Sequence, residues 1–199
     1  MSINERILSP FTLPNGTELK NRLLMAPMTT CTGYYDGTVT SELVEYYRAR
    51  SGSIGTIIVE CCFVDDLGLA FPGAIGIDND EKIAGLAKIA EAIKSKGSKA
   101  LLQIYHGGRM VDPKLIGGRT PVGPSAVAAP RDGAATPVAL TGEEVEGMIG
   151  KFGEAVRRAI QAGFDGVEIH GANTYLIQQF YSPNSNQRDD EWGGSRDNR

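Results

Sequence analysis

Cysteine and histidine are scarce in this chain of 199 residues, which has three cysteines and two histidines. The number of cysteines is odd and Cys61 and Cys62 are adjacent, a pattern that does not suit a disulfide framework and is typical of a reducing compartment. His106 and His170 show no zinc-ligand spacing with the cysteines, so no metal site is expected. The sequence therefore argues against disulfide-rich and zinc-dependent proteins.

Basic runs and long apolar runs are also lacking. The formal net charge is −4 and no run of five basic residues occurs, so nucleic acid is not expected as a partner. No window holds the roughly 20 apolar residues of a membrane-spanning helix, and the N-terminus does not resemble a signal peptide. We therefore expect a cytoplasmic protein without a membrane partner, and a single domain over residues 1–199.

Short β-branched or apolar runs alternate with amphipathic stretches along most of the chain. Strands are predicted at 23–26, 55–60, 99–104 and 166–170. Helices are predicted at 41–50, from Ile83 to a stop signal at Gly97, and from a capping box at 141–144 to Gly163. The strands are apolar on both faces for most of their length, which is typical of a parallel sheet covered by helices.

Two other segments lack this alternation. Residues 1–22 contain a predicted hairpin with its turn at Asn15-Gly16, and residues 107–140 form a long loop rich in Gly, Pro and Ala, a kind that is usually functional. Periodicity leaves both a doubly wound sheet and a β/α barrel open. A glycine-rich dinucleotide-binding fingerprint is absent after the first strand, where Pro27-Met28-Thr29 stands, and this favours the barrel.

Reactive side chains are expected at the carboxyl ends of the strands, where the sites of both folds lie. Strand alternation places Glu168 and His170 on one face at the fourth end, and Asn173 and Tyr175 follow. Two neutral hydrogen-bond donors beside a phenol can polarise a carbonyl or nitro oxygen and deliver a proton. Alternatively, His170 and Asn173 satisfy backbone groups and Tyr175 packs in a core; spacing alone does not decide between the two.

Ordered blocks of sequence support the chemical interpretation. They read RLLMAPM at 22–28, IIVE at 57–60, QIYHGGR at 103–109, HGANTYL at 170–176 and FYSPNSNQRDDEWGGS at 180–195. The series resembles the old yellow enzyme family from about residue 7 to the last residue. The resemblance implies an α/β fold, an FMN-containing (β/α)₈ TIM barrel, of which the chain would supply the N-terminal hairpin and about four β/α units. The FMN-phosphate site, expected after strands seven and eight, would lie outside these residues.

The implied activity is that of an ene-reductase, an oxidoreductase that takes hydride from NADH or NADPH and reduces activated C=C bonds in small molecules such as enones. By the same resemblance, His170 and Asn173 would hold the oxygen of the substrate, and Tyr175 would donate the proton. Thr174 departs from the glycine that many relatives carry between Asn173 and Tyr175. Its Cβ predicts an altered turn next to the proton donor.

On the flavin side, the resemblance implies that FMN contacts Pro27, Met28, Thr29, Cys61, Gln103 and His170. The Thr29 hydroxyl would bond the carbonyl edge of the flavin, and Gln103 would bond its pyrimidine edge. Cys61 would approach the flavin mainly through its backbone. The thiols of Cys61 and Cys62 are expected to be small buried hydrophobic groups.

Two other interpretations stay open. A half-barrel would expose two strand edges, so the chain is alternatively a non-catalytic fragment that needs homo-oligomerisation or a complementary half-barrel chain. A different FMN barrel, such as a dihydroorotate or dihydrouridine enzyme, would leave the arrangement of His170, Asn173 and Tyr175 unexplained.

Overall fold

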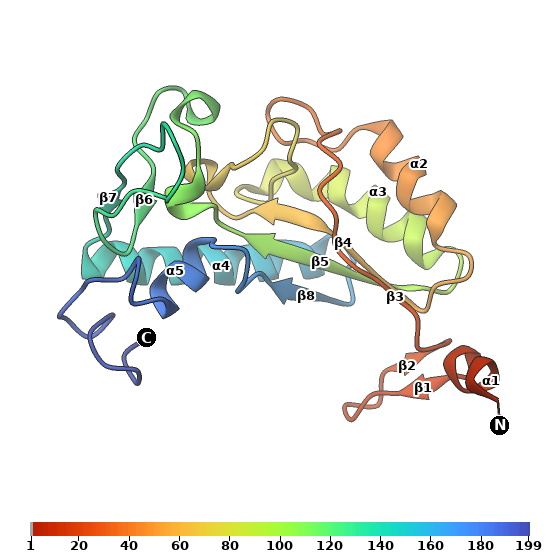
Figure 1. Ribbon diagram of the computed structural model, residues 1–199. Coiled ribbons are helices and arrows are strands. Elements are labelled where there is room, and N and C mark those ends of the chain that lie inside the picture. Colours follow the sequence, from red (N-terminus) through yellow and green to blue (C-terminus); the bar gives the residue numbers. More distant parts are fainter. Residues whose placement is uncertain (1) are drawn as a thin grey trace.

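A four-stranded parallel sheet forms the centre of the computed structural model, which describes residues 2–199 (Figure 1). Its strands, in spatial order, are β3 (Leu24–Met25), β4 (Thr56–Phe63), β5 (Lys99–Tyr105) and β8 (Gly166–Ile169). The helices between them in the chain are α2 (Ser41–Arg50), α3 (Ile83–Lys94) and α4 (Gly142–Gln161). Each strand pairs with the next one in the chain, whereas a doubly wound sheet would reverse this order. The predicted strands and helices are confirmed, with small shifts at their ends.

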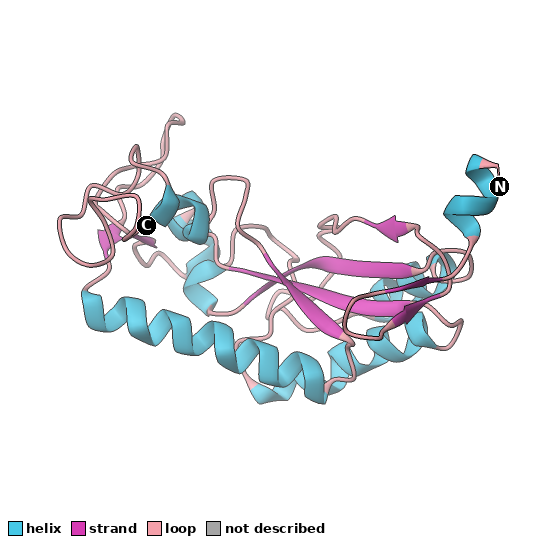
Figure 2. Ribbon diagram, turned by 90° about the horizontal axis from the view of Figure 1, so that it is seen from below, coloured by secondary structure: helices cyan, strands magenta, loops and turns pink. Residues whose placement is uncertain are grey.

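All three helices lie on the same face of the sheet (Figure 2). Their apolar sides meet the sheet in one cluster of fully buried side chains: Leu43, Tyr47, Ile57, Val59, Leu86, Ile89, Ile93, Leu102, Ile104, Ala155 and Ala159. Burial of a leucine or isoleucine side chain contributes about 1.5–3 kcal/mol, so this cluster is the main source of stability. None of the helices within residues 2–199 is long and apolar enough to cross a membrane.

Strand β4 is longer than the sequence predicted. The prediction that it ends at Glu60 is wrong, because the register shifts between Val59 and Cys62 and the strand continues to Phe63. Between these two residues β4 has one residue more than β5, as in a β-bulge, and the pairing with β5 resumes at Cys62. Cys61 and Cys62 therefore lie inside the strand, and both side chains are buried.

The two outer strands carry exposed apolar side chains. Leu24 in β3 is 57% exposed and Ile169 in β8 is 58% exposed. Unpaired edges of parallel strands favour pairing with further backbone. A homo-oligomer or a complementary half-barrel chain stays a prediction.

A small N-terminal unit lies near the amino ends of the strands (Figure 1). It consists of α1 (Ile3–Leu8) and the antiparallel pair β1 (Phe11–Thr12) and β2 (Glu18–Leu19), joined through the Asn15-Gly16 turn. Gly16 has a φ of 86°, which glycine adopts without strain. Helix α1 was not predicted, although Ser2 and Glu5 form a capping box at its start.

Residues 107–140 contain short regular elements rather than only loop. These are the 3₁₀ helices η3 (Gly108–Met110) and η4 (Pro113–Ile116) and the parallel pair β6 (Val122–Gly123) and β7 (Val138–Ala139). Two more 3₁₀ helices, η1 (Asp66–Gly68) and η2 (Asp80–Lys82), follow β4, and α5 (Leu176–Tyr181) follows β8. Together with the segment after α5, they gather near the carboxyl ends of the strands (Figure 1).

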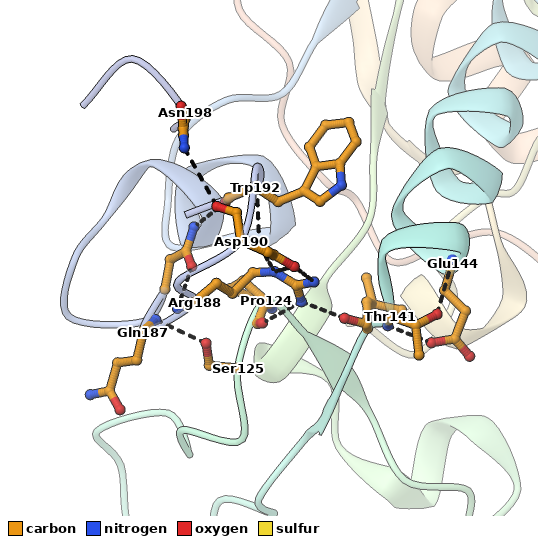
Figure 3. Close-up of polar contacts among 11 residues, drawn as sticks. Pro124, Ser125, Thr141, Glu144, Gln187, Arg188, Asp190, Trp192 and Asn198 are labelled. Carbon is orange, nitrogen blue, oxygen red and sulfur yellow. Dashed lines mark hydrogen bonds and ion pairs between the residues drawn. The ribbon is translucent and has the colours of Figure 1, made fainter. Parts of the chain in front are cut away.

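Arg188 connects the C-terminal segment to the rest of this region (Figure 3). Its guanidinium donates to the carbonyl of Pro124 at 3.0 Å and pairs with Asp190 at 2.9 Å. The neighbouring Gln187 N–H donates to the Ser125 hydroxyl at 2.9 Å. Two chain segments more than 60 residues apart in sequence are thereby held together.

Lys20 joins the N-terminal unit to the ends of two helices. Its ammonium donates to the carbonyls of Ser51 and Gly52, both at 3.1 Å, and of Lys96 at 2.9 Å. Ser51 is the C-cap of α2, and Lys96 follows the end of α3. A cation at the C-terminal end of a helix satisfies free carbonyls and interacts favourably with the helix dipole.

We expect Lys20→Met to lower the free energy of unfolding by about 1–2 kcal/mol, because three carbonyls lose a charged donor. Urea denaturation followed by circular dichroism measures this loss. Lys96→Met is the matched control, since the Lys96 side chain is exposed and forms no hydrogen bond or ion pair with any residue from 2 to 199. Equal losses in both variants would contradict the assigned role.

His106 is the second residue on which the fold depends. It is 1% exposed, its Nδ1 accepts the Gly108 N–H at 3.0 Å, and its carbonyl accepts the Leu176 N–H at 3.0 Å. A Cβ on Gly68 would lie 2.7 Å from the imidazole of His106. Helix η1 can therefore pack this close to His106 only because residue 68 is glycine. Its Nε2 has no partner among the described residues. Burial lowers the pKa of His106 to about 4.

Stability is expected to fall on acidification because of this histidine. Its pKa in the folded protein, about 4, is below the roughly 6.5 of an unfolded chain. The stabilisation is therefore complete above pH ~6.5 and is lost as the pH falls towards 4, by roughly 3 kcal/mol in total. Unfolding free energies at pH 7 and pH 5 measure it. His106→Asn cannot titrate and should show a flatter pH dependence; identical slopes would disprove the assignment.

Candidate active site

Four aromatic side chains meet beyond the carboxyl ends of β5 and β8. Tyr175 is central: its ring centroid lies 5.3 Å from that of Tyr105, 4.9 Å from that of His170 and 6.3 Å from that of Phe71. The rings of His170 and Tyr175 are nearly perpendicular, at 89°. Such edge-to-face pairs contribute about 0.5–1.5 kcal/mol beyond their burial. They fix the orientation of the Tyr175 phenol.

His170 presents a single N–H donor. Its Nδ1 accepts the N–H of Ala172 at 3.3 Å, so in the neutral imidazole the proton lies on Nε2. Burial lowers the pKa of His170, and the charge of Glu168 only partly opposes this. The imidazole is therefore neutral at pH 7 and donates through Nε2.

The phenol of Tyr175 is protonated over the whole physiological range. Burial raises its pKa to about 12, with a smaller contribution from Cys61. The Tyr175 hydroxyl forms no hydrogen bond with another residue of the part of the chain that the structure covers. It is a free donor on a ring whose centroid lies 4.9 Å from that of the His170 imidazole.

Asn173 lies in a left-handed turn between these two residues. Its φ is 54° and that of Thr174 is 62°, both unusual for residues other than glycine. Thr174 is thus a β-branched residue in a conformation that glycine favours, and the expected change of the turn stays a prediction. The Asn173 side chain is exposed and has no hydrogen-bond partner within residues 2–199. The structure brings His170 and Tyr175 together and leaves the Asn173 amide facing solvent.

Thr29 and Cys61 are in direct contact. The Thr29 Oγ1 lies 3.0 Å from the Cys61 Sγ, and burial raises the pKa of the Cys61 thiol to about 11. A protonated thiol can donate to the threonine oxygen, which leaves the hydroxyl proton available to another acceptor. Cys61 also packs in the same cluster as Tyr105 and Tyr175. The end of β4, which carries Cys61, therefore lies close to the segment after β8, which carries Tyr175.

Pro27 and Met28 form an open backbone segment after β3. Met28 is 53% exposed and Pro27 is half-buried. The N–H groups of Met28 and Thr29 make no hydrogen bond to the described residues. These two N–H groups are therefore open to a ligand.

Gln103 forms a pair with Glu168 on the face of the sheet opposite the helices. Its Nε2 donates to Glu168 Oε1 at 2.7 Å, which leaves the Gln103 carbonyl oxygen as a free acceptor. Gln103 is 8% exposed, and Glu168 is half-buried. The two residues sit in paired positions of β5 and β8.

Several residues near the site were not identified from sequence. Glu60 is fully buried and accepts from the Tyr47 hydroxyl at 3.1 Å and from the Thr30 N–H at 3.1 Å. Burial raises the pKa of Glu60, and the hydrogen bonds from Thr30 and Tyr47 oppose this rise. The position of Glu60 inside an apolar strand was the available signal. Phe71 lies in a loop and gave no signal.

No group of three or more His, Cys, Asp or Glu side chains within residues 2–199 is arranged to hold a metal ion.

Comparison with known proteins identifies the family. Residues 6–199 match the NADH:flavin oxidoreductase / NADH oxidase family. The chain is 89% identical over its full length to an NADH:fumarate oxidoreductase of Klebsiella pneumoniae, of which it covers 22%. It is 59% identical over 194 residues to an NADH:acrylate oxidoreductase of Vibrio harveyi, covering 98% of this chain and 19% of that protein. The chain thus spans about a fifth of the length of these relatives.

Solved structures agree with this assignment. The old yellow enzyme homologue from Zymomonas mobilis superposes with a TM-score of 0.88 at 34% identity, over 96% of this chain and 56% of that one. A 2-naphthoyl-CoA reductase superposes with a TM-score of 0.93 at 31% identity, over 98% of this chain and 32% of that one. These matches confirm the β/α-barrel fold class and the resemblance to old yellow enzymes. The chain belongs to the NADH:flavin oxidoreductase / NADH oxidase family.

Proposed function

We propose that this chain provides the substrate side of an FMN-dependent oxidoreductase that takes hydride from NADH or NADPH and reduces activated C=C bonds. The observation that carries the proposal is the fixed pair of free donors, the Nε2–H of His170 and the hydroxyl of Tyr175, in rings 4.9 Å apart. The names of relatives support it, because fumarate and acrylate are electron-poor alkenes. Morphinone reductase is among the similar structures.

FMN fits the groups at the neighbouring strand ends. The Thr29 hydroxyl has a proton to donate when it accepts from Cys61, and Gln103 has a free carbonyl oxygen. The unpaired N–H groups of Met28 and Thr29 add donors for flavin oxygens and nitrogens. We therefore assign Pro27, Met28, Thr29, Cys61 and Gln103 to the flavin side, with His170 between flavin and substrate. When bound, FMN supplies the hydride transfer.

On the substrate side, His170 and Asn173 hold the electron-withdrawing oxygen of the alkene. The neutral imidazole donates from Nε2, and the exposed Asn173 amide has two donors free. As hydride reaches the β-carbon, negative charge develops on this oxygen. Hydrogen bonds to it strengthen in the transition state more than in the ground state, which is what accelerates the reaction.

Tyr175 then donates its proton to the α-carbon. With a pKa of about 12, the phenol stays protonated at the working pH and becomes a strong base once it has given up the proton. It recovers a proton from solvent, since it is only half-buried. General acid catalysis of this kind contributes about 10²- to 10⁴-fold.

Tyr175→Phe should slow alkene reduction by about 10²-fold or more while leaving FMN reduction by NADH unchanged, because only the second half-reaction needs the proton. Stopped-flow measurement of flavin absorbance separates the two half-reactions in the FMN-loaded protein. Tyr35→Phe is the control, since Tyr35 is 84% exposed. Equal losses in both half-reactions would rule out the assigned role.

Thr29→Val should lower the two-electron reduction potential of bound FMN, since a hydroxyl donor to the flavin favours the electron-rich reduced form. One neutral hydrogen bond of about 1 kcal/mol corresponds to a shift of roughly 20–30 mV. Thr29→Ser keeps the hydroxyl and should keep the potential. A spectroelectrochemical titration measures the potential. The same potential in wild type, Thr29→Val and Thr29→Ser would show that the Thr29 hydroxyl does not bond the flavin.

A further inference from the structure

The turn at Asn173 and Thr174 needs an external support. Two successive residues with left-handed backbone angles, 54° and 62°, are strained when neither is glycine. Such conformations persist only where the surrounding structure holds them. The turn also separates His170 from Tyr175, so any relaxation would move the proposed proton donor relative to the imidazole.

Gln179 in α5 provides that support. Its side chain is 1% exposed, and its Nε2 donates to the carbonyls of Thr174 at 2.6 Å and of Gly107 at 3.1 Å. Its Oε1 accepts the N–H of Arg109 at 3.1 Å. All the donors and one acceptor of this amide are used on backbone groups of two loops, one after β5 and one after β8.

The fit around Gln179 leaves little freedom. A Cβ on Gly108 would lie 2.3 Å from the Gln179 Oε1, so the loop after β5 is pressed against the amide. The Gln179 N–H donates to the Tyr175 carbonyl at 2.8 Å, and the Ser185 hydroxyl donates to the Gln179 carbonyl at 2.8 Å. The charged neighbour Arg109 directs its guanidinium away, to the carbonyls of Val127 and Ala128.

We infer that Gln179 is a positioning residue for alkene reduction, which holds the Asn173-Thr174 turn against the loop after β5 and so fixes the aim of Tyr175. The inference rests on the proposed function. Gln179 is buried behind the turn and is placed on neither the flavin side nor the substrate side. It acts through Tyr175, whose backbone it contacts on both sides, at Thr174 and at the first turn of α5.

The adjacent Gln178 offers a matched control. Its Oε1 accepts the N–H of Thr174, so it uses only the acceptor half of its amide on the turn. Gln178→Glu keeps that acceptor. Gln179→Glu has the same change in size and charge but loses the Nε2 donor to two carbonyls. Only Gln179→Glu removes donors from the turn. Because Gln179 is buried and Gln178 is half-buried, the uncharged Gln179→Met is measured beside it, which separates the loss of the donors from the burial of a charge.

In the FMN-loaded protein, Gln179→Glu should slow alkene reduction by about 10- to 100-fold, as expected for a catalytic group misplaced by about 1 Å. FMN reduction by NADH should stay within about twofold, and Gln178→Glu should match wild type in both half-reactions. The uncharged Gln179→Met should show the same selective loss, and it replaces Gln179→Glu if that variant does not fold. An equal effect of Gln178→Glu and the Gln179 variant would overturn the inference.

A double-mutant cycle separates positioning from a general loss of structure. In a Tyr175→Phe background, Gln179→Glu should have little further effect on alkene reduction, because both act through one group. Additive losses would overturn the inference. Hydrogen exchange of residues 171–176 should rise in Gln179→Glu and not in Gln178→Glu, and this readout requires no turnover. Failure of the proposed function appears instead as a wild-type protein that reduces no alkene.

Discussion

Packing of α2, α3 and α4 on a single face of the sheet is the constraint on which the rest of the molecule depends. It places the apolar side chains of β4 and β5, such as Val59 and Leu102, towards the helices. Polar side chains are left to the opposite face, where Gln103 and Glu168 bond each other. A polar group buried without a partner is costly, so this face is organised by hydrogen bonds. The same face continues into the loops that carry Tyr175 and Thr29.

The fold was largely readable from the sequence because local signals dominate it. The capping box before α4 and the stripe of apolar residues in α3 mark elements whose ends depend on their own residues. The length of β4 was not readable, because its last residues form a strand only through pairing with β5 and with Gly76. The short elements in residues 107–140 likewise depend on contacts with distant loops.

The candidate site was predictable only in part. The positions of His170, Tyr175, Thr29 and Gln103 followed from strand ends and from the family resemblance. Their partners did not, since Phe71, Glu60 and Gln179 lie in segments whose sequence suggests a loop, a strand interior and an apolar helix. Each acts through a contact between residues far apart in the chain, as Gln179 does with Gly107 at a separation of 72. No pattern of local spacing encodes such a contact.

The contacts of Lys20 also bear on how the chain assembles during synthesis. Lys20 is synthesised before one of its partners, because the carbonyl of Lys96 belongs to a residue 76 positions later. Translation proceeds at about 5–20 residues per second, so Lys96 is synthesised several seconds after Lys20. Lys20 can therefore complete its contacts with the ends of α2 and α3 only after both helices have been synthesised.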